Sequence, residues 1–159
     1  MSQTEIIFGY HASIAVLKNP QRKILSLKCT QEFLNKNKDL IEERSIGKVQ
    51  ILKRKALDAE INNNIHQGMI LECAKLEKKT FNDIENSEQF IILLDSLTDS
   101  QNVGSIIRSS YLYGISTIIY NKDNSFEISP FLIKSASGAY EKVKMIEVVN
   151  LSRSLEFLK

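Results

Sequence analysis

The chain has 159 residues, of which 43% are hydrophobic and 25% charged, and its formal net charge is +2. This length allows one full domain or two small ones, and the composition is typical of a globular protein that works in water. No apolar run is long enough to span a bilayer, and the N-terminus lacks a basic start and an apolar signal core. We therefore expect a cytoplasmic protein with no membrane partner.

Strands alternate with helices over roughly the first 75 residues. We expect a short strand and a Gly-Tyr-His turn, then an amphipathic helix that stops before Pro20. Thr30 is the expected N-cap of a second helix that ends at Gly47. The remaining expected strands are 23–29, 48–53 and 69–76, and the third expected helix is 54–63. This order predicts a small α/β sandwich.

The polar stretch 78–88 has nothing to bury beyond Phe81 and Ile84, so we interpret it as a linker between two domains. A strand follows at Phe90–Leu94, and its near-continuous apolar run indicates burial on both faces of a parallel sheet. A helix from about Val103 to Tyr113 comes next. Further strands are expected at 116–122 and 143–149. A short helix is expected to end near Gly138, and a last helix to begin at Ser152.

Basic residues are concentrated between Lys18 and Lys55. This segment holds eleven lysines and arginines against four acidic residues, so its net charge is +7 and that of the remainder is −5. A basic half predicts a polyanionic partner such as RNA or DNA, although a solvated lysine-rich surface explains the pattern equally well.

The cysteines and histidines do not form a metal-binding pattern. Cys29 and Cys73 stand far apart without a CxxC motif, and we expect two reduced thiols that are at least partly buried. His11 and His66 are not at metal-ligand spacing from each other or from a cysteine, so we expect no metal.

The loop "DSLTDSQNVG" leaves the carboxyl end of the strand at Phe90–Leu94, where parallel α/β sheets bind ligands. Either Ser100, Gln101 or Asn102 is expected to cap the following helix. Gly104 is expected to leave open space, over which the guanidinium of Arg108, four residues on, can fold. Free helix amides under an arginine would bind phosphate, whereas an ordinary capped helix with a surface arginine fits the same residues.

The stretch "LLDSLTDSQNVGSIIRSSYLYGI" resembles the first motif of the SpoU (TrmH) family of RNA ribose 2′-O-methyltransferases, in the SPOUT superfamily. The stretches "IIFGYHASIAVLKNP" and "IHQGMILECAKL" resemble the start and the end of that family's substrate-binding domain. Residues 129–159 resemble the part between the family's first and second motifs. The bacterial members that methylate a guanosine ribose in 23S rRNA are the most similar.

The resemblance implies three parts: an RNA substrate-binding domain at 1–77, a linker at 78–88, and the N-terminal half of a Rossmann-like SPOUT domain at 89–159. The first domain would be similar to kink-turn-binding ribosomal proteins. The family implies S-adenosylmethionine as the methyl donor and places Asn102 and Arg108 in the active site. Because a guanidinium stays protonated, we assign Arg108 to phosphate positioning and charge stabilisation.

The resemblance stops at Lys159, before the family's second and third motifs, which form the cofactor pocket, the trefoil knot and much of the homodimer interface. We therefore expect a truncated domain that lacks the knot, has no cofactor-binding residue and is inactive alone. A second chain that completes the domain is one explanation, and a fragment is another. The alternative function is that of a non-catalytic RNA-binding protein.

RNA contacts are expected from two loops and four basic side chains of the first domain. The loops are Gly9-Tyr10-His11 and His66-Gln67-Gly68. The glycines permit tight turns, and a tyrosine or histidine can stack on an unpaired base. The expected phosphate contacts are Arg22, Lys23, Lys53 and Arg54. A core tyrosine with two structural histidines is the alternative.

Overall fold

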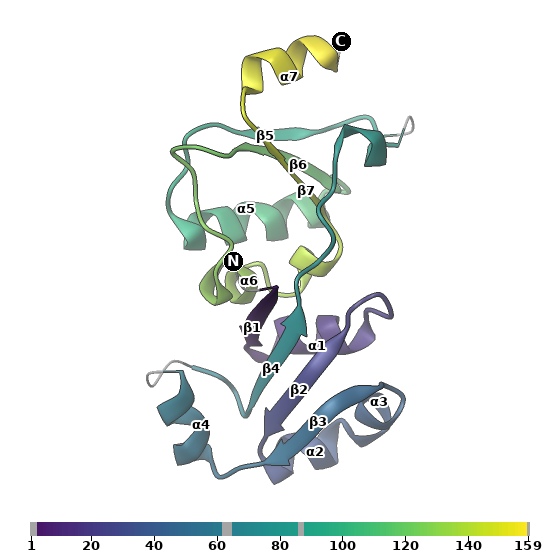
Figure 1. Cartoon of the computed structure of the whole chain (residues 1–159), viewed down its shortest axis with the longest axis vertical. Coiled ribbons are helices and arrows are strands. Elements are labelled where there is room, and N and C mark those ends of the chain that lie inside the picture. Colours follow the sequence, from purple (N-terminus) through teal and green to yellow (C-terminus); the bar gives the residue numbers. More distant parts are fainter. Residues whose placement is uncertain (1–2, 62–64, 86–87, 159) are drawn as a thin grey trace. The chain divides into compact units, whose positions relative to one another are not determined.

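The computed structural model describes residues 3–61, 65–85 and 88–158 of the chain (Figure 1). The chain divides into two compact units, Met1–Leu76 and Glu77–Lys159, which we call unit 1 and unit 2. In these described ranges, no helix combines the length and the apolar character that a membrane span requires.

Unit 1 is a four-stranded mixed sheet with helices. Its strands lie in the order β1-β4-β2-β3 (Figure 1). Strand β4 runs antiparallel to β1 and β2, whereas β3 is parallel to β2. The elements in chain order are β1 (Thr4–Phe8), α1 (Tyr10–Lys18), β2 (Ile24–Cys29), α2 (Gln31–Lys36), α3 (Lys38–Glu42), β3 (Ile46–Ile51), α4 (Arg54–Glu60) and β4 (Met69–Ala74). The predicted alternation of strands and helices is confirmed.

Apolar side chains fill both faces of this sheet because neighbouring residues of a strand point to opposite sides. Phe8 and its cross-strand partner Ile70 pack with Leu57 of α4. The adjacent Ile7 is fully buried and faces the other side. Cys29 and Cys73 are both buried thiols, as predicted. Within the described residues, no group of three or more His, Cys, Asp or Glu could hold a metal ion.

The stretch 30–46 forms two short helices instead of one. Thr30 caps α2 as predicted, with its hydroxyl accepting from the N–H of Phe33 at 3.2 Å. The break lies at Asn37, whose backbone N–H and side-chain amide both donate to the Phe33 carbonyl, at 3.1 and 2.9 Å. These bonds close α2, and α3 starts from the next residue.

Gly47 lies inside β3, so its prediction as a helix end is wrong. The backbone of β2 is irregular at Leu25 and comes close to this glycine. A Cβ at position 47 would lie only 2.6 Å from the Leu25 carbonyl oxygen. The glycine is therefore required by a close approach of two strands. The helix expected at 54–63 ends at Glu60, and residues 62 and 63 lie outside the described residues.

Unit 2 is built on a parallel sheet with the strand order β5-β6-β7. Its elements are η1 (Phe81–Asp83), β5 (Ile92–Leu94), α5 (Ser100–Leu112), β6 (Thr117–Asn121), α6 (Pro130–Ser135), η2 (Ala139–Glu141), β7 (Lys144–Val148) and α7 (Leu151–Phe157). Figure 1 shows α5 and α7 on opposite sides of the sheet. One face buries Ile119 and Ile146 beside Leu151 of α7, and the buried Ile118 alternates to the face that α5 covers.

The predicted linker 78–88 is part of unit 2. Lys79 forms an isolated parallel bridge with Ile146 of β7. The ring of Phe81 lies 5.1 Å from that of Phe157, and Ile84 joins the same apolar cluster. These two apolar residues are enough to attach the segment, although residues 86 and 87 lie outside the described part of the chain.

Strand β5 is less buried than its apolar sequence predicts. Leu94 is 5% exposed, but Phe90 precedes the strand and is 68% exposed. Burial on both faces is therefore wrong for the start of this run. The physical reason is position, because β5 begins only at Ile92 and Phe90 lies before it, outside the sheet.

Candidate functional site

Four segments of unit 1 meet at one end of its sheet. Cys29 at the end of β2 pairs with Met69 at the start of β4 and with Ile51 at the end of β3. Phe8 at the end of β1 pairs with Ile70. The residues that follow β1, β2 and β3 therefore lie beside those that precede β4. We call the following side chains the sheet-end surface: Tyr10, His11, Gln31, Lys36, Lys53, Arg54, Lys55 and Gln67.

A hydrogen bond joins the two loops that were predicted to lie near RNA. The side-chain Oε1 of Gln67 accepts from the backbone N–H of Tyr10 at 2.7 Å. Gly9 and Gly68 have φ angles of 93° and 90°, a conformation that glycine adopts at little cost. The turn at Gly68 is present as predicted, whereas Tyr10 and His11 belong to the first turn of α1, which Gly9 precedes. The structure thus brings the two loops together, and their contact with RNA stays a prediction.

His66 is held inside unit 1 with 1% of its surface exposed. Its Nδ1 accepts from the N–H of Gly68 at 3.0 Å, so the ring proton is on Nε2, which lies 2.9 Å from Oδ1 of Asp58. A buried ring cannot stack on a base, and the structure contradicts direct contact of His66 with RNA. His66 instead fixes the turn at Gln67, whose φ of 57° is uncommon for a residue other than glycine.

Arg22 is also buried, with 3% of its surface exposed. It forms an ion pair with Glu5 of β1, and its Nη1 donates to the Ala74 carbonyl at 2.6 Å. These partners lie where β1 begins and β4 ends, at the sheet end opposite the sheet-end surface. Arg22 as a phosphate contact is therefore wrong, because its guanidinium is already neutralised in the interior. Lys23 is exposed but lies at this same opposite end, and its carbonyl accepts from the N–H of Ala74 at 2.9 Å.

In unit 2, helix α5 is capped by Asp99. The Oδ1 atom of Asp99 accepts from the N–H groups of Gln101 and Asn102 at 2.7 and 3.2 Å. The prediction of Ser100, Gln101 or Asn102 as the cap is therefore wrong by one residue. A carboxylate occupies the amides that were expected to be free, and its negative charge opposes phosphate. The amides of Gln101 and Asn102 are therefore not free for a phosphate, and a phosphate contact of Arg108 stays a prediction.

Gly104 lies at a close contact between α5 and α6. A Cβ on Gly104 would be 2.6 Å from the Cβ of Ser135 and 2.7 Å from the carbonyl oxygen of Leu132. The hydroxyl of Ser135 also donates to the carbonyl of Gln101 at 3.0 Å. The open space predicted beside this glycine is filled by α6, so Gly104 serves helix packing.

Asn102 and Arg108 are both exposed on α5. Because they are six residues apart, their side chains leave the helix at directions roughly 120° apart. Arg108 makes no ion pair within the described part of the chain. The helix alone does not bring these two side chains together, and their role in catalysis stays a prediction.

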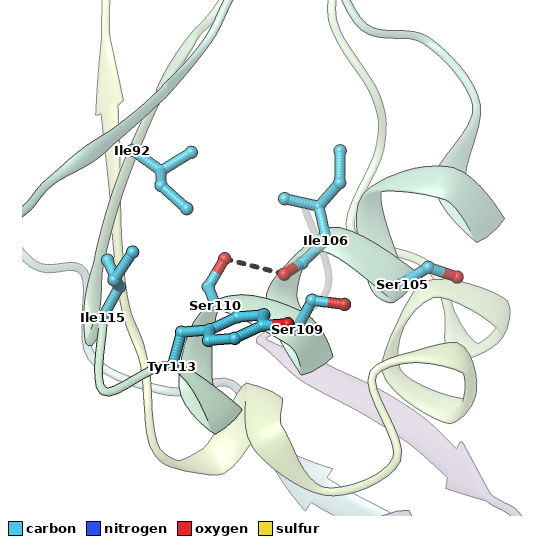
Figure 2. Close-up of a pocket in the computed structure, with 7 residues that line it drawn as sticks. All are labelled: Ile92, Ser105, Ile106, Ser109, Ser110, Tyr113 and Ile115. Atoms are coloured by element: carbon cyan, nitrogen blue, oxygen red, sulfur yellow. Dashed lines mark hydrogen bonds between the residues drawn. The ribbon is translucent and has the colours of Figure 1, made fainter.

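An apolar groove of about 290 Å³ lies between β5 and α5. Figure 2 shows Ile92 and Ile115 on one side of it, Ile106 on the other and the ring of Tyr113 at its lower end. The hydroxyl of Ser110 donates to the carbonyl of Ile106 at 2.7 Å. No charged side chain lines this groove. Beyond the serine hydroxyls, its lining offers no partner for the charged amino-acid end of S-adenosylmethionine.

Sequence reasoning missed Lys36 and Asp99. The ammonium of Lys36 lies over the ring of Tyr10, and nothing in the sequence links these two positions. Asp99 could have been found, because aspartate is one of the best N-cap residues and it stands directly before the helical pattern.

Two family models match the chain. Residues 6–79 match "RNA 2'-O ribose methyltransferase substrate binding", and residues 89–159 match the "SpoU rRNA Methylase family". The chain is 31% identical over 169 residues to the 23S rRNA (guanosine-2'-O-)-methyltransferase RlmB of Yersinia pestis, covering 98% of this chain and 67% of that protein. The protein of the same name from Photorhabdus laumondii is 32% identical over 166 residues, with coverages of 98% and 67%.

Solved structures share the fold. The SpoU methyltransferase AviRb of Streptomyces viridochromogenes, in complex with the cofactor AdoMet, gives a TM-score of 0.78 at 14% identity, over 98% of this chain and 59% of that one. The AdoMet-bound rRNA methyltransferase of Sinorhizobium meliloti gives 0.76 at 16% identity, over 98% and 58%. The chain thus spans about two thirds of the curated relatives and under two thirds of these solved chains.

Proposed function

The chain belongs to the SpoU rRNA methylase family, and from this premise we propose that it serves as an rRNA ribose 2′-O-methyltransferase acting on a guanosine of 23S rRNA. The names of the relatives at about 30% identity support this substrate. S-adenosylmethionine is the cofactor of the family. We assign no residue of this chain to the cofactor.

The observation that carries the RNA-binding part of the proposal is the sheet-end surface. Strand topology brings its basic side chains to one end of unit 1, together with an aromatic ring and polar loop residues. Lys53, Arg54 and Lys55 are all exposed there and come at the start of α4. Basic side chains and an aromatic ring at the same end of one sheet suit a nucleic acid with unpaired bases, although only Lys36 lies over the ring itself.

In unit 2 we propose that Arg108 holds a phosphate near the reacting ribose. A guanidinium is always charged and offers donors in a planar fork that matches two phosphate oxygens. It cannot take the proton of the 2′-hydroxyl. Asn102 can both donate to and accept from ribose hydroxyls, and since it leaves α5 in another direction it would contact a different part of the nucleotide.

Methyl transfer is tested with labelled S-adenosylmethionine and unmodified 23S rRNA. We expect Arg108→Ala to lower kcat by tenfold or more, and Arg153→Ala, which removes an exposed arginine of α7, to leave it unchanged. Equal loss in both variants would contradict the special role of Arg108. Absence of any transfer by the unaltered chain would refute catalysis by this chain alone and would agree with the inactivity expected from the sequence.

The second candidate is RNA binding without methyl transfer. It is favoured by the position of the sheet-end surface entirely within unit 1, and by the lack of charged lining in the groove of unit 2. Calorimetric titration of S-adenosylmethionine, with and without an rRNA fragment, separates the two. No heat in either case would leave RNA binding alone, whereas saturable binding would favour the enzyme.

We also propose the cytoplasmic location expected of the family, which cell fractionation tests. Because the motifs that form much of the family's homodimer interface lie beyond the resemblance, we propose that this chain does not form that dimer unaided. Sedimentation velocity over a range of protein concentrations tests this, and a stable dimer at low concentration would contradict it.

A further inference from the structure

Tyr10 presents an aromatic ring at the sheet-end surface beneath a lysine. The Nζ of Lys36 lies over the ring, 5.1 Å from its centroid. The ring also meets those of Phe33 and His11 in T-shaped contacts, with centroids 6.2 and 5.5 Å away. Phe33 is 5% exposed and belongs to the core, whereas His11 and Lys36 are exposed. The ring of Tyr10 is therefore anchored on the core and covered by a flexible side chain.

Lys36 is not held in place by a carboxylate. Glu32 stands four positions earlier in α2, a spacing that commonly gives an ion pair, yet no ion pair joins the two within the described residues. The ammonium lies over the tyrosine ring instead. An exposed contact of a cation with an aromatic ring is weak, so Lys36 can leave the ring when a better partner arrives.

The position of Tyr10 is fixed by other residues of unit 1. Gln67 holds its backbone N–H at 2.7 Å, and the turn that carries Gln67 is fixed by His66 through the N–H of Gly68. His66 is in turn bonded to Asp58 of α4. The ring therefore needs little ordering when a ligand binds, which favours affinity.

We propose that the ring of Tyr10 is a stacking site for one unpaired base of the bound RNA, and that Lys36 leaves the ring to bind a phosphate beside that base. This proposal rests on the RNA binding proposed above for unit 1. Stacking of a base on an aromatic ring is stronger than an exposed cation–ring contact and accepts any base. Since bases inside a duplex are not open to side chains, the ligand is looped or single-stranded RNA.

The test uses the full chain and two RNA probes of equal length. One is a 23S rRNA hairpin whose unpaired loop carries 2-aminopurine, and the other is a fully paired duplex with the same label. Tyr10→Leu removes the ring and Tyr10→Phe keeps it. Lys36→Met removes the cation, and Lys18→Met is its matched control, because Lys18 is exposed at the far end of α1.

We expect hairpin fluorescence to be quenched by the unaltered chain and by Tyr10→Phe, but not by Tyr10→Leu, which should bind the hairpin roughly tenfold more weakly. Affinity for the duplex should not change with Tyr10→Leu. Lys36→Met should lower the slope of log affinity against log salt by about 0.7 to 1. Lys18→Met should leave that slope unchanged.

Two results would overturn the stacking site while RNA binding stands: binding without quenching by the unaltered chain, or full quenching and affinity in Tyr10→Leu. An unchanged salt slope in Lys36→Met would refute the movement of the lysine, and this exposed substitution does not disturb the core. If the unaltered chain bound neither probe, the RNA-binding function itself would fail together with the stacking site. Circular dichroism confirms that Tyr10→Leu is folded before its affinity is compared.

Discussion

Replacing Gly104 by alanine tests whether this glycine serves packing. In an exposed helix interior the change would stabilise the protein by about 1 kcal/mol. Here the new methyl group would lie 2.6 Å from the Cβ of Ser135 and 2.7 Å from the carbonyl oxygen of Leu132. Neither atom can rotate away, because one is backbone and the other is attached to it. Overpacking of a core costs about 1 to 3 kcal/mol, and such rigid neighbours favour the upper part of that range.

The overpacking cost is partly offset by the better helix propensity of alanine. We therefore expect Gly104→Ala to lower the free energy of unfolding by about 1 to 2 kcal/mol, or the Tm by roughly 5 to 15 °C. Near-UV circular dichroism is a suitable probe, since four of the five tyrosines lie in unit 2. Ser109→Ala is the control, because Ser109 is exposed on the same helix and its replacement should stabilise by roughly 0.5 kcal/mol. A Gly104→Ala protein as stable as the unaltered chain would refute the packing role and restore the open space predicted from sequence.

Three further predictions concern buried charges and a buried thiol. Arg22→Met leaves its carboxylate partner buried without a cation, so urea denaturation should show a loss of about 3 to 5 kcal/mol, while a change near zero would contradict the buried pair. Burial alone would raise the pKa of Glu88, but the hydrogen bond from Lys144 at 2.7 Å and weaker contacts hold it below the ordinary 4.5. The ionised Glu88 thus stabilises the fold above pH 4.5, and this stabilisation is lost as the pH falls through the lowered pKa. Glu88→Gln should therefore reduce the decrease in the free energy of unfolding, measured with urea, between neutral and acidic pH. An unchanged pH dependence would exclude this contribution. Burial also raises the pKa of Cys29, so a thiol reagent should label it only after unfolding, and fast labelling of the folded chain would contradict its burial.

Local rules recovered much of the fold because they depend on neighbours in sequence. Thr30 caps α2 as its hydroxyl chemistry predicts, and the strands of both sheets follow the apolar runs. The failures come from contacts that are distant in sequence. Gly47 is required by the close approach of Leu25 on the neighbouring strand, and Phe90 is exposed because the sheet pairing begins only at Ile92. A local pattern contains neither fact.

The candidate site shows the same division. Gly9 and Gly68 were recognised as turn residues because a tight turn has a local signature, and both have positive φ. Residue type alone could not separate the buried Arg22 and His66 from the exposed Lys53 and Arg54. A charged side chain binds a ligand or an internal carboxylate by the same chemistry, and only the topology of the sheet decides which partner is near.

The pattern of Asn102, Gly104 and Arg108 in α5 therefore has two different explanations. Gly104 is required by the contact with α6, so its presence says nothing about catalysis. Asn102 lends only its backbone N–H to the helix cap, which any residue could supply, and Arg108 has no ion pair in the described ranges. Among the described residues neither side chain thus has a structural task that the fold displays, and their role in ligand binding stays a prediction. Asn102→Ala and Arg108→Ala should each leave the free energy of unfolding, measured by urea denaturation, within about 0.5 kcal/mol of that of the unaltered chain. A larger loss in either would mean that its side chain serves the fold.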